Sequence, residues 1–231
     1  MKTCLFLSFK SRTEPTVDEI AKIDGILRTT PRLAKALIHT PSATHDPYVK
    51  DEPPPSLVLQ LYFAELSDLE SAVSRTGTLF DLSARTDLPA IAGGGAAQQA
   101  MVVRSFAVPE PAFRTAPGEP HCTYLVSYEG EADDLNAWHT HYLESHIGYM
   151  AMFPDIRELE VYTRLDWVSA LPWPRFNFMQ RNKVVFDSAE ALDHALNSQV
   201  RHEMRADFKT FPRFAGLNRH YAMATRVVSA P

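Results

Sequence analysis

Hydrophobic positions along the chain form two kinds of pattern, runs typical of strands and stripes typical of amphipathic helices. Residues 3–10 form an apolar run that predicts a buried strand, and the next apolar positions recur at the spacing of one helix face: Val17, Ile20, Ile23 and Leu27. Further elements are expected in this half: strands at 33–40, 56–65 and 100–108, a proline-rich loop at 46–55, and a helix whose capping box starts at Ser67. This order is that of a ferredoxin-like βαββαβ unit.

The second half of the chain repeats the first. Residues 31–40 align with 154–163, and 61–63 with 184–186, at a constant offset of 123. Near the start of each half, Leu7-Ser8-Phe9 matches Val126-Ser127-Tyr128 at an offset of 119. The elements expected here are strands at 121–128, 156–165, 178–186 and 219–228, and helices at 132–153, 189–197 and 203–210. A duplicated unit accounts for this self-similarity.

The repeat predicts an α+β fold with two tandem ferredoxin-like units, residues 1–108 and 121–231, joined by the linker 109–120 with its four prolines. Each antiparallel sheet would have helices on one face only. Facing the two bare sheet faces toward each other would bury both and form an intramolecular α/β barrel with helices outside. A homodimer of two such pseudo-dimers is left open.

Composition and charge narrow the classes of partner. The net charge is -5 and no Lys/Arg cluster is present, which argues against a nucleic-acid partner. No apolar run approaches the roughly 20 residues that a membrane span needs, and the N-terminus does not resemble a signal peptide. Cys4 and Cys122 lie in the first strand of each half and are expected to be buried and reduced. A cytoplasmic protein is therefore expected.

One histidine lies on the apolar face of the helix expected at 132–153. On a helical wheel the inward stripe contains Leu135, Trp138, Tyr142, His146, Tyr149 and Phe153. His146 occupies the place of Ile23 in the first half. A buried imidazole needs hydrogen-bond partners, so it is either a general acid/base facing a cavity or a group satisfied by a carbonyl or tyrosine hydroxyl without chemistry. Because an aliphatic copy cannot transfer protons, we expect any pocket to be asymmetric and to lie in the second half, with no larger polar-lined cavity beside residues 17–27 of the first.

A metal site is not expected on this helix. His139 and His141 are two residues apart, so on a helix their side chains point about 200° apart and cannot bind one ion. His139 and His146 share a side but lie about two turns apart. No nucleotide fingerprint, phosphate loop or nucleophile elbow is present either, so no cofactor is expected.

The motif Trp138-x-x-His141-Tyr142-x-x-x-His146, followed by Phe153-Pro154, resembles the EthD-like group of dimeric α/β-barrel proteins. The segment 205–211 is similar to that family's Asp-x-x-x-Phe motif, and the likeness covers residues 122–228. Where the family usually has Pro-Gly after the helix, this chain has Pro154-Asp155.

The resemblance implies that single-unit relatives dimerise into the barrel that this chain would form alone. It also implies a range of activities, because related barrels include cofactor-independent isomerases, cyclases, dehydratases and decarboxylases acting on small cyclic compounds. Others are small haem-binding monooxygenases, and some have no assigned reaction.

The leading hypothesis is a cofactor-independent isomerase, dehydratase or lyase-type enzyme for a small aromatic or cyclic oxygenated compound. His146 would move a proton, Tyr142 or Tyr149 would hydrogen-bond a carbonyl or enolate oxygen, and Asp207 would orient the imidazole. The residues expected to contact the substrate are Trp138, Tyr149, Tyr128, Tyr162 and His220. For the three on strands, Tyr128, Tyr162 and His220, cross-strand packing or solvent exposure is the alternative.

Two other functions stay open. In a haem-binding monooxygenase-like protein His146 would be the axial ligand, although no pair of cationic residues beside the helix is evident for the propionates. A non-catalytic binding or accessory protein would use the loop with Trp167 and Trp173, which either covers a pocket mouth, forms an interface or packs on the fold. Arg181 and Lys183, which alternate with Asn182, are expected to form a solvated strand face.

Overall fold

Eight antiparallel strands close into one barrel, in the order β1-β3-β2-β8-β5-β7-β6-β4. The computed structural model describes residues 1–44, 46–49 and 52–228 of the 231. The strands are β1 (Thr3–Lys10), β2 (Leu33–Pro41), β3 (Leu57–Phe63), β4 (Gly95–Phe106), β5 (His121–Tyr128), β6 (Ile156–Arg164), β7 (Gln180–Phe186) and β8 (Asn218–Val228). The predicted α+β barrel is thus confirmed.

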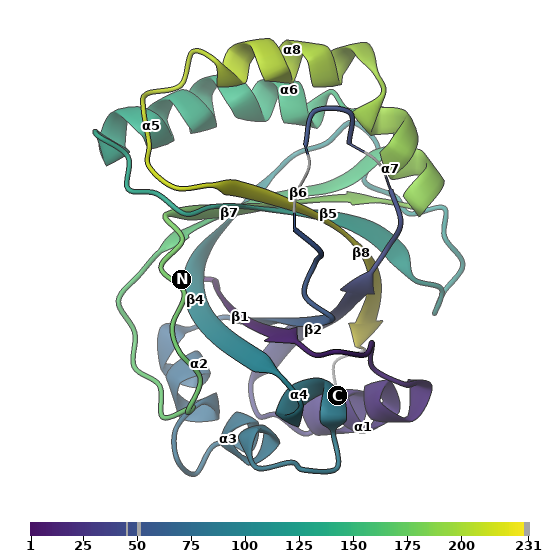
Figure 1. Cartoon of the computed structure of the whole chain (residues 1–231), viewed down its shortest axis with the longest axis vertical. Coiled ribbons are helices and arrows are strands. Elements are labelled where there is room, and N and C mark those ends of the chain that lie inside the picture. The colour runs from purple at the N-terminus through teal and green to yellow at the C-terminus, as the bar shows by residue number, and fades with distance from the viewer. Residues whose placement is uncertain (45, 50–51, 229–231) are drawn as a thin grey trace.

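Helices cover the barrel on two opposite sides (Figure 1). On one side lie α1 (Val17–Arg28), α2 (Leu66–Ala72), α3 (Thr78–Ser83) and α4 (Pro89–Ala92). On the other lie α5 (Leu135–His141), the π-helical turn η1 (Tyr142–His146), α6 (Ile147–Ala151), α7 (Ala189–Leu196) and α8 (Gln199–Phe208). None of the described helices is long and apolar enough to span a membrane.

The two halves of the barrel have the same strand order. It is β4-β1-β3-β2 in the first half and β8-β5-β7-β6 in the second, and the pairs β2–β8 and β4–β6 join the halves. Lys35 Nζ lies 3.2 Å from Glu158 Oε1, an ion pair between positions that the repeat equates at its offset of 123. Some residues of the predicted ranges lie outside the described residues. These are residue 45 of the first unit, residues 50–51 of the predicted loop 46–55, and residues 229–231 of the second unit.

Local sequence explains where the helices begin. At α1, Thr16 accepts a hydrogen bond from the Glu19 amide and the Glu19 carboxylate accepts one from the Thr16 amide, so this helix has a capping box. The capping box predicted at Ser67 is wrong, because α2 starts at Leu66 after Glu65, whose side chain makes no capping bond. The short helices α3 and α4 were not predicted, and β4 begins five residues earlier than expected.

The apolar core has three parts. One lies between α1–α4 and the strands of the first half, and a second lies between α5–α8 and the strands of the second. The third is inside the barrel and contains Phe6, Tyr62 and Met101. Both cysteines are free and buried, as the sequence predicts.

The barrel interior also holds charged groups, and the predicted solvated face of β7 is wrong. Lys183 is 0% exposed and Arg181 8% exposed. Side chains alternate along a strand, so these two lie opposite Asn182. Asn182 faces the helices, so Arg181 and Lys183 lie on the other face of β7. In a single sheet that face would meet solvent, but closure of the barrel turns it inward.

A buried ionic network is centred on Lys183 inside the barrel. Its ammonium group lies 2.9 Å from Glu160 Oε2 and 2.9 Å from Glu158 Oε1. The Tyr62 and Tyr162 hydroxyls both donate to Glu160, at 2.5 and 2.6 Å. The fully buried Tyr162 therefore belongs to this network.

Candidate active site

The π-helical turn η1 positions His146 and changes which residues face inward after it. A π-helical turn contains one more residue than an α-helical turn, so the helix face rotates relative to a regular wheel. Met150 is consequently 1% exposed and faces the second core, while Tyr149 is only partly buried. Such turns occur frequently at functional sites.

Asp207, on α8, holds the imidazole of His146. The distance from His146 Nδ1 to Asp207 Oδ2 is 2.7 Å, and both side chains are almost fully buried. The other carboxylate oxygen accepts a hydrogen bond from Ser145 Oγ at 2.7 Å and lies 3.3 Å from His141 Nε2. The sequence analysis assigned this orienting role to Asp207, and the structure brings the two groups into contact.

The surroundings keep the imidazole neutral and the carboxylate charged. Burial lowers the pKa of His146, and its hydrogen bond to Asp207 opposes this shift without cancelling it. For Asp207, burial raises the pKa, but hydrogen bonds from Ser145 and His146 together lower it. With the proton on Nδ1 toward the carboxylate, His146 Nε2 carries the lone pair of a base.

A cavity of about 200 Å³ lies beside His146, between the helices and the outer face of the sheet. Strands β5, β7 and β8 form its floor, and α6, α8 and the 46–49 segment form its walls. The lining side chains with polar groups are Tyr48, Tyr124, Tyr128, His146, Asn182, Arg201, Arg205, Asn218 and His220.

An ion pair closes one wall of this cavity. Arg201 Nη2 donates to Asp46 Oδ2 at 2.8 Å, and the Tyr124 hydroxyl donates to the same oxygen at 2.7 Å. His220 stacks on Tyr124 with ring centroids 5.6 Å apart. Asp46 comes from the first half of the chain, so both halves build the site. Sequence reasoning missed Arg201 and Asp46, which are 155 residues apart and carry no motif.

The residues predicted to form the site fall into two groups. His146, Tyr128 and His220 line the cavity, and Asp207 lies behind His146. Trp138 and Tyr142 are 0% exposed and stack on each other at 5.2 Å, and Tyr128 packs against both. The residues that do not line the cavity are Trp138, Tyr142, Tyr149 and Tyr162.

The prediction that the larger cavity would lie in the second half is wrong. A groove of about 580 Å³ runs beside α1 and is lined by Val17, Ile20 and Asp24. A cavity of about 530 Å³ lies at one end of the barrel, between the halves. Ile23, the counterpart of His146 in the first half, is fully buried, as expected for an aliphatic residue that packs in the core. It does not line the groove, which therefore follows another side of α1.

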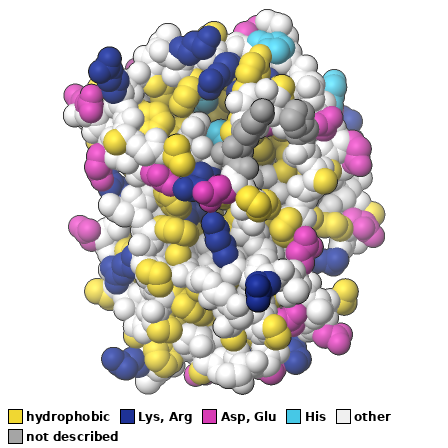
Figure 2. All heavy atoms as spheres, in the orientation of Figure 1, with side chains coloured by type: hydrophobic (Ala, Val, Ile, Leu, Met, Phe, Trp, Pro, Cys, Tyr) yellow, Lys and Arg dark blue, Asp and Glu magenta, His cyan; other side chains and the backbone are white. Residues whose placement is uncertain are grey.

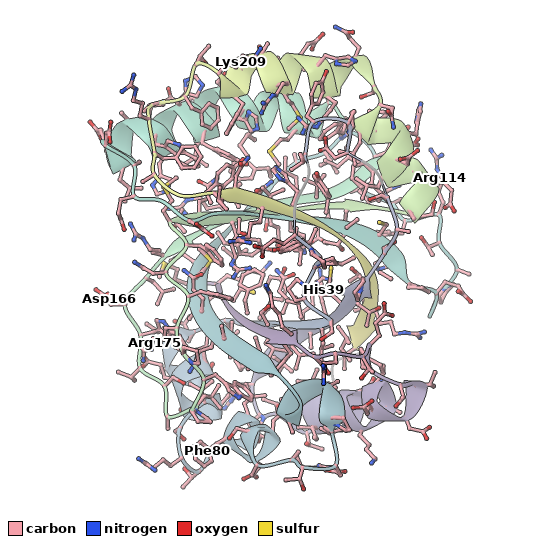
Figure 3. The ribbon with its side chains drawn as sticks, viewed as in Figure 1. His39, Phe80, Arg114, Asp166, Arg175 and Lys209 are labelled. Carbon is pink, nitrogen blue, oxygen red and sulfur yellow. The ribbon has the colours of Figure 1, made fainter. Side chains whose placement is uncertain are left out.

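The segment 165–179, between β6 and β7, packs on the first half of the chain. Trp173 lies edge to face on Phe9 at 5.0 Å, and the Ala170 amide donates to the Val73 carbonyl. Figure 3 labels Asp166 and Arg175 on this segment, which runs along the outside of the barrel. It does not cover the cavity at His146, so packing on the fold explains its tryptophans.

The site offers no evident set of metal ligands. Within the described part of the chain, no group of three or more His, Cys, Asp or Glu residues is placed to hold a metal ion. The cavity is also smaller than the ~300 Å³ at which drug-sized ligand pockets begin, so it suits a small compound better than a porphyrin.

Comparison with known proteins identifies the fold. An anthrone oxidase-like protein superposes with a TM-score of 0.61 at 14% identity, over 99% of this chain and 93% of its own. A putative monooxygenase from Fusobacterium nucleatum gives 0.59 at 9% identity, over 99% and 93%. Such low identity shows a likeness of fold alone, over nearly the whole of this chain.

The comparisons do not establish membership of the EthD-like group. An EthD-family protein from Bacillus halodurans matches 43% of this chain and 96% of its own at 18% identity, but its TM-score of 0.34 carries no argument. No family model matches the sequence. The comparison with curated proteins finds no match.

Proposed function

We propose that the protein is a cofactor-independent isomerase, dehydratase or other lyase-type enzyme for a small aromatic or cyclic oxygenated compound. The observation that carries this proposal is the 2.7 Å contact between His146 Nδ1 and a charged Asp207, beside a cavity that the same histidine lines. A neutral imidazole with an oriented partner is suited to general base catalysis. The name of one structural neighbour, an anthrone oxidase-like protein, supports testing aromatic ketones first.

The reaction would start by removal of a proton from a carbon next to a carbonyl group. His146 Nε2 takes the proton, the carbon–hydrogen electron pair moves into an enolate, and Asp207 stabilises the imidazolium that forms. The imidazolium then returns the proton. Return to a different carbon completes an isomerisation, and donation to a departing hydroxyl group releases water and completes a dehydration.

Tyr128 is the best-placed donor for the enolate oxygen. It lines the cavity, and burial raises its pKa to about 12, so the hydroxyl keeps its proton at neutral pH. Tyr142, to which the sequence analysis gave this role, packs behind it with ring centroids 5.7 Å apart. Tyr142 therefore acts as a positioning residue for Tyr128 and His146.

Solvent exchange of ketone protons tests the proposal. In D₂O, the wild-type protein should accelerate loss of the α-proton NMR signals of small aromatic ketones such as 2-tetralone, and His146→Ala should reduce that rate about 10²–10⁴-fold. His194→Ala is the matched control, because His194 is exposed and is not among the residues that line the cavity. Full exchange activity in a folded His146→Ala protein would reject His146 as the base.

Binding without exchange would favour the non-catalytic alternative. Ketones that protect the protein thermally, but whose protons exchange no faster than in buffer, would indicate a small-molecule binding or accessory protein. For the haem alternative, the wall cation Arg201 is already paired with Asp46, which leaves it a poor partner for a propionate. Haem titration of the wild type should accordingly give no new Soret band. A Soret band that appears in the wild type and is lost in His146→Ala would support the haem alternative.

The tandem organisation is part of the same proposal. We take residues 1–108 and 121–231 as two ferredoxin-like units, supported by their identical strand order and by the sequence repeat. The site contains groups from both units, since Asp46 binds Arg201.

A further inference from the structure

A second cavity, of about 530 Å³, lies at one end of the barrel, separate from the His146 site. Its walls are largely apolar and include Val58, Leu125, Phe176 and Phe178. On the face shown in Figure 2, basic and acidic side chains lie together near the middle, with hydrophobic side chains next to them. A cavity of this size and character is typical of small-molecule sites.

One cation, Arg181, reaches this cavity from inside the barrel and has no counter-ion among the described residues. Arg181 is 8% exposed, and its Nε and Nη2 atoms are buried with no hydrogen-bond partner in the described chain. No carboxylate of the described residues lies within 4.0 Å of it. Its contacts are aromatic: the guanidinium carbon lies 4.7 Å from the Phe6 ring centroid and 4.5 Å from that of Phe178.

The fold itself does not require a cation here. Val58 stands 123 positions earlier, at the equivalent place in the first half, and lines the same cavity. Burial lowers the pKa of Arg181 to about 10, so the group remains charged at neutral pH despite the cost of desolvation. An unpaired buried charge that the duplicate lacks indicates a ligand that supplies the missing partner.

The other charges around the cavity are already compensated. Arg219, at the rim, lies 2.9 Å from Glu129 and 3.0 Å from Glu52. Lys10, which also lines the cavity, lies 3.6 Å from the same Glu52. Deeper in the barrel, Glu158 and Glu160 both form ion pairs with Lys183, and they also pair with Lys35 and Lys2 respectively. Among the described residues that line this cavity, Arg181 is thus the cation without a carboxylate partner, and a ligand with one negative charge would supply it.

We propose that this cavity binds a small amphipathic monoanion, an aromatic or alicyclic carboxylate, whose carboxylate pairs with Arg181 while its ring contacts the apolar wall. The planar guanidinium fork matches a carboxylate in bidentate geometry. Hydroxyl groups of Ser8 and Ser127, which the repeat equates at its offset of 119, line the cavity and are available to the same ligand. This site is independent of the proton-transfer chemistry assigned to His146.

Calorimetric titration with 2-naphthoate and its neutral analogue 2-naphthamide tests the proposal. The full-length wild type should bind 2-naphthoate at least tenfold more tightly than 2-naphthamide. Arg181→Met should remove this preference, whereas Arg226→Met, which deletes an exposed arginine away from the cavity lining, should preserve it. Equal affinity of the wild type for the two probes would overturn the proposal, as would an unchanged preference in Arg181→Met.

Melting temperature separates a ligand-binding role from a structural one. Because Arg181→Met replaces an unpaired buried cation by an apolar chain, it should melt at the wild-type temperature or above. A lower melting temperature with the naphthoate preference intact would assign Arg181 to packing against its aromatic neighbours. If Arg181→Met does not fold, Arg181→Lys provides the test: it keeps the charge but loses the fork, and should weaken naphthoate binding more than naphthamide binding.

Discussion

Replacing Asp207 by Asn removes the charge that faces His146 and keeps the size of the side chain. The imidazolium formed by proton transfer would then lose a charged acceptor at 2.7 Å. Hydrogen bonds to charged groups contribute about 1.5–3 kcal/mol, which corresponds to an exchange rate about 10- to 150-fold lower. The change leaves the residues that line the cavity in place, so binding of the ketone should be little affected.

The pH dependence of exchange provides the assay. In the wild type burial lowers the pKa of His146, and this effect outweighs the hydrogen bond that the imidazole donates to Asp207. The rate should therefore rise with pH until that pKa is passed and stay level above it. In Asp207→Asn the pKa falls further, since the opposing carboxylate is gone, so the plateau should begin at lower pH and be lower in height.

Ser145→Ala is the control for this measurement. Ser145 donates to the other carboxylate oxygen, so its loss keeps the charge beside His146 and should cost much less activity. A folded Asp207→Asn protein with the wild-type plateau rate would refute the reasoning, because the charged partner would then contribute nothing to the transition state.

Two further predictions concern the barrel interior. Burial, reinforced by Lys183, lowers the pKa of His39 to about 3, so the unfolded state binds a proton first as pH falls below about 6.5. Protonation of His39 in the unfolded state should lower the free energy of unfolding by about 2–3 kcal/mol between pH 7 and 4.5. In His39→Asn, the urea midpoint should fall less over this pH range than it does in the wild type. Glu160→Gln removes one of the carboxylates that pair with the buried Lys183, so it should lower the free energy of unfolding in urea by about 3–5 kcal/mol. The double variant Glu160→Gln with Lys183→Met removes the buried charge as well and should regain most of that loss. Equal stability of Glu160→Gln and wild type would contradict this prediction.

Strand positions follow closely from the sequence, because strands buried on both faces are continuous apolar runs. The ranges 3–10 and 121–128 agree with β1 and β5. Helices α3 and α4 were missed, since six and four residues are too few to show a helical period. The extra residue of η1 is equally invisible to a helical wheel, which is why Tyr149 was expected in the site and Met150 was not.

The sequence by itself determined the order of the strands and of the longer helices and placed a histidine on an apolar helix face, and its self-similarity predicted a duplication. These are local properties that periodicity and self-similarity record. Whether a strand face meets solvent or the inside of a barrel depends on pairing between strands far apart in the chain, such as Ala36 with Val228 and Met101 with Arg164. Only the tertiary structure could therefore bury Lys183 and Arg181 inside the barrel and bring Asp46 from the first half to Arg201 in the second.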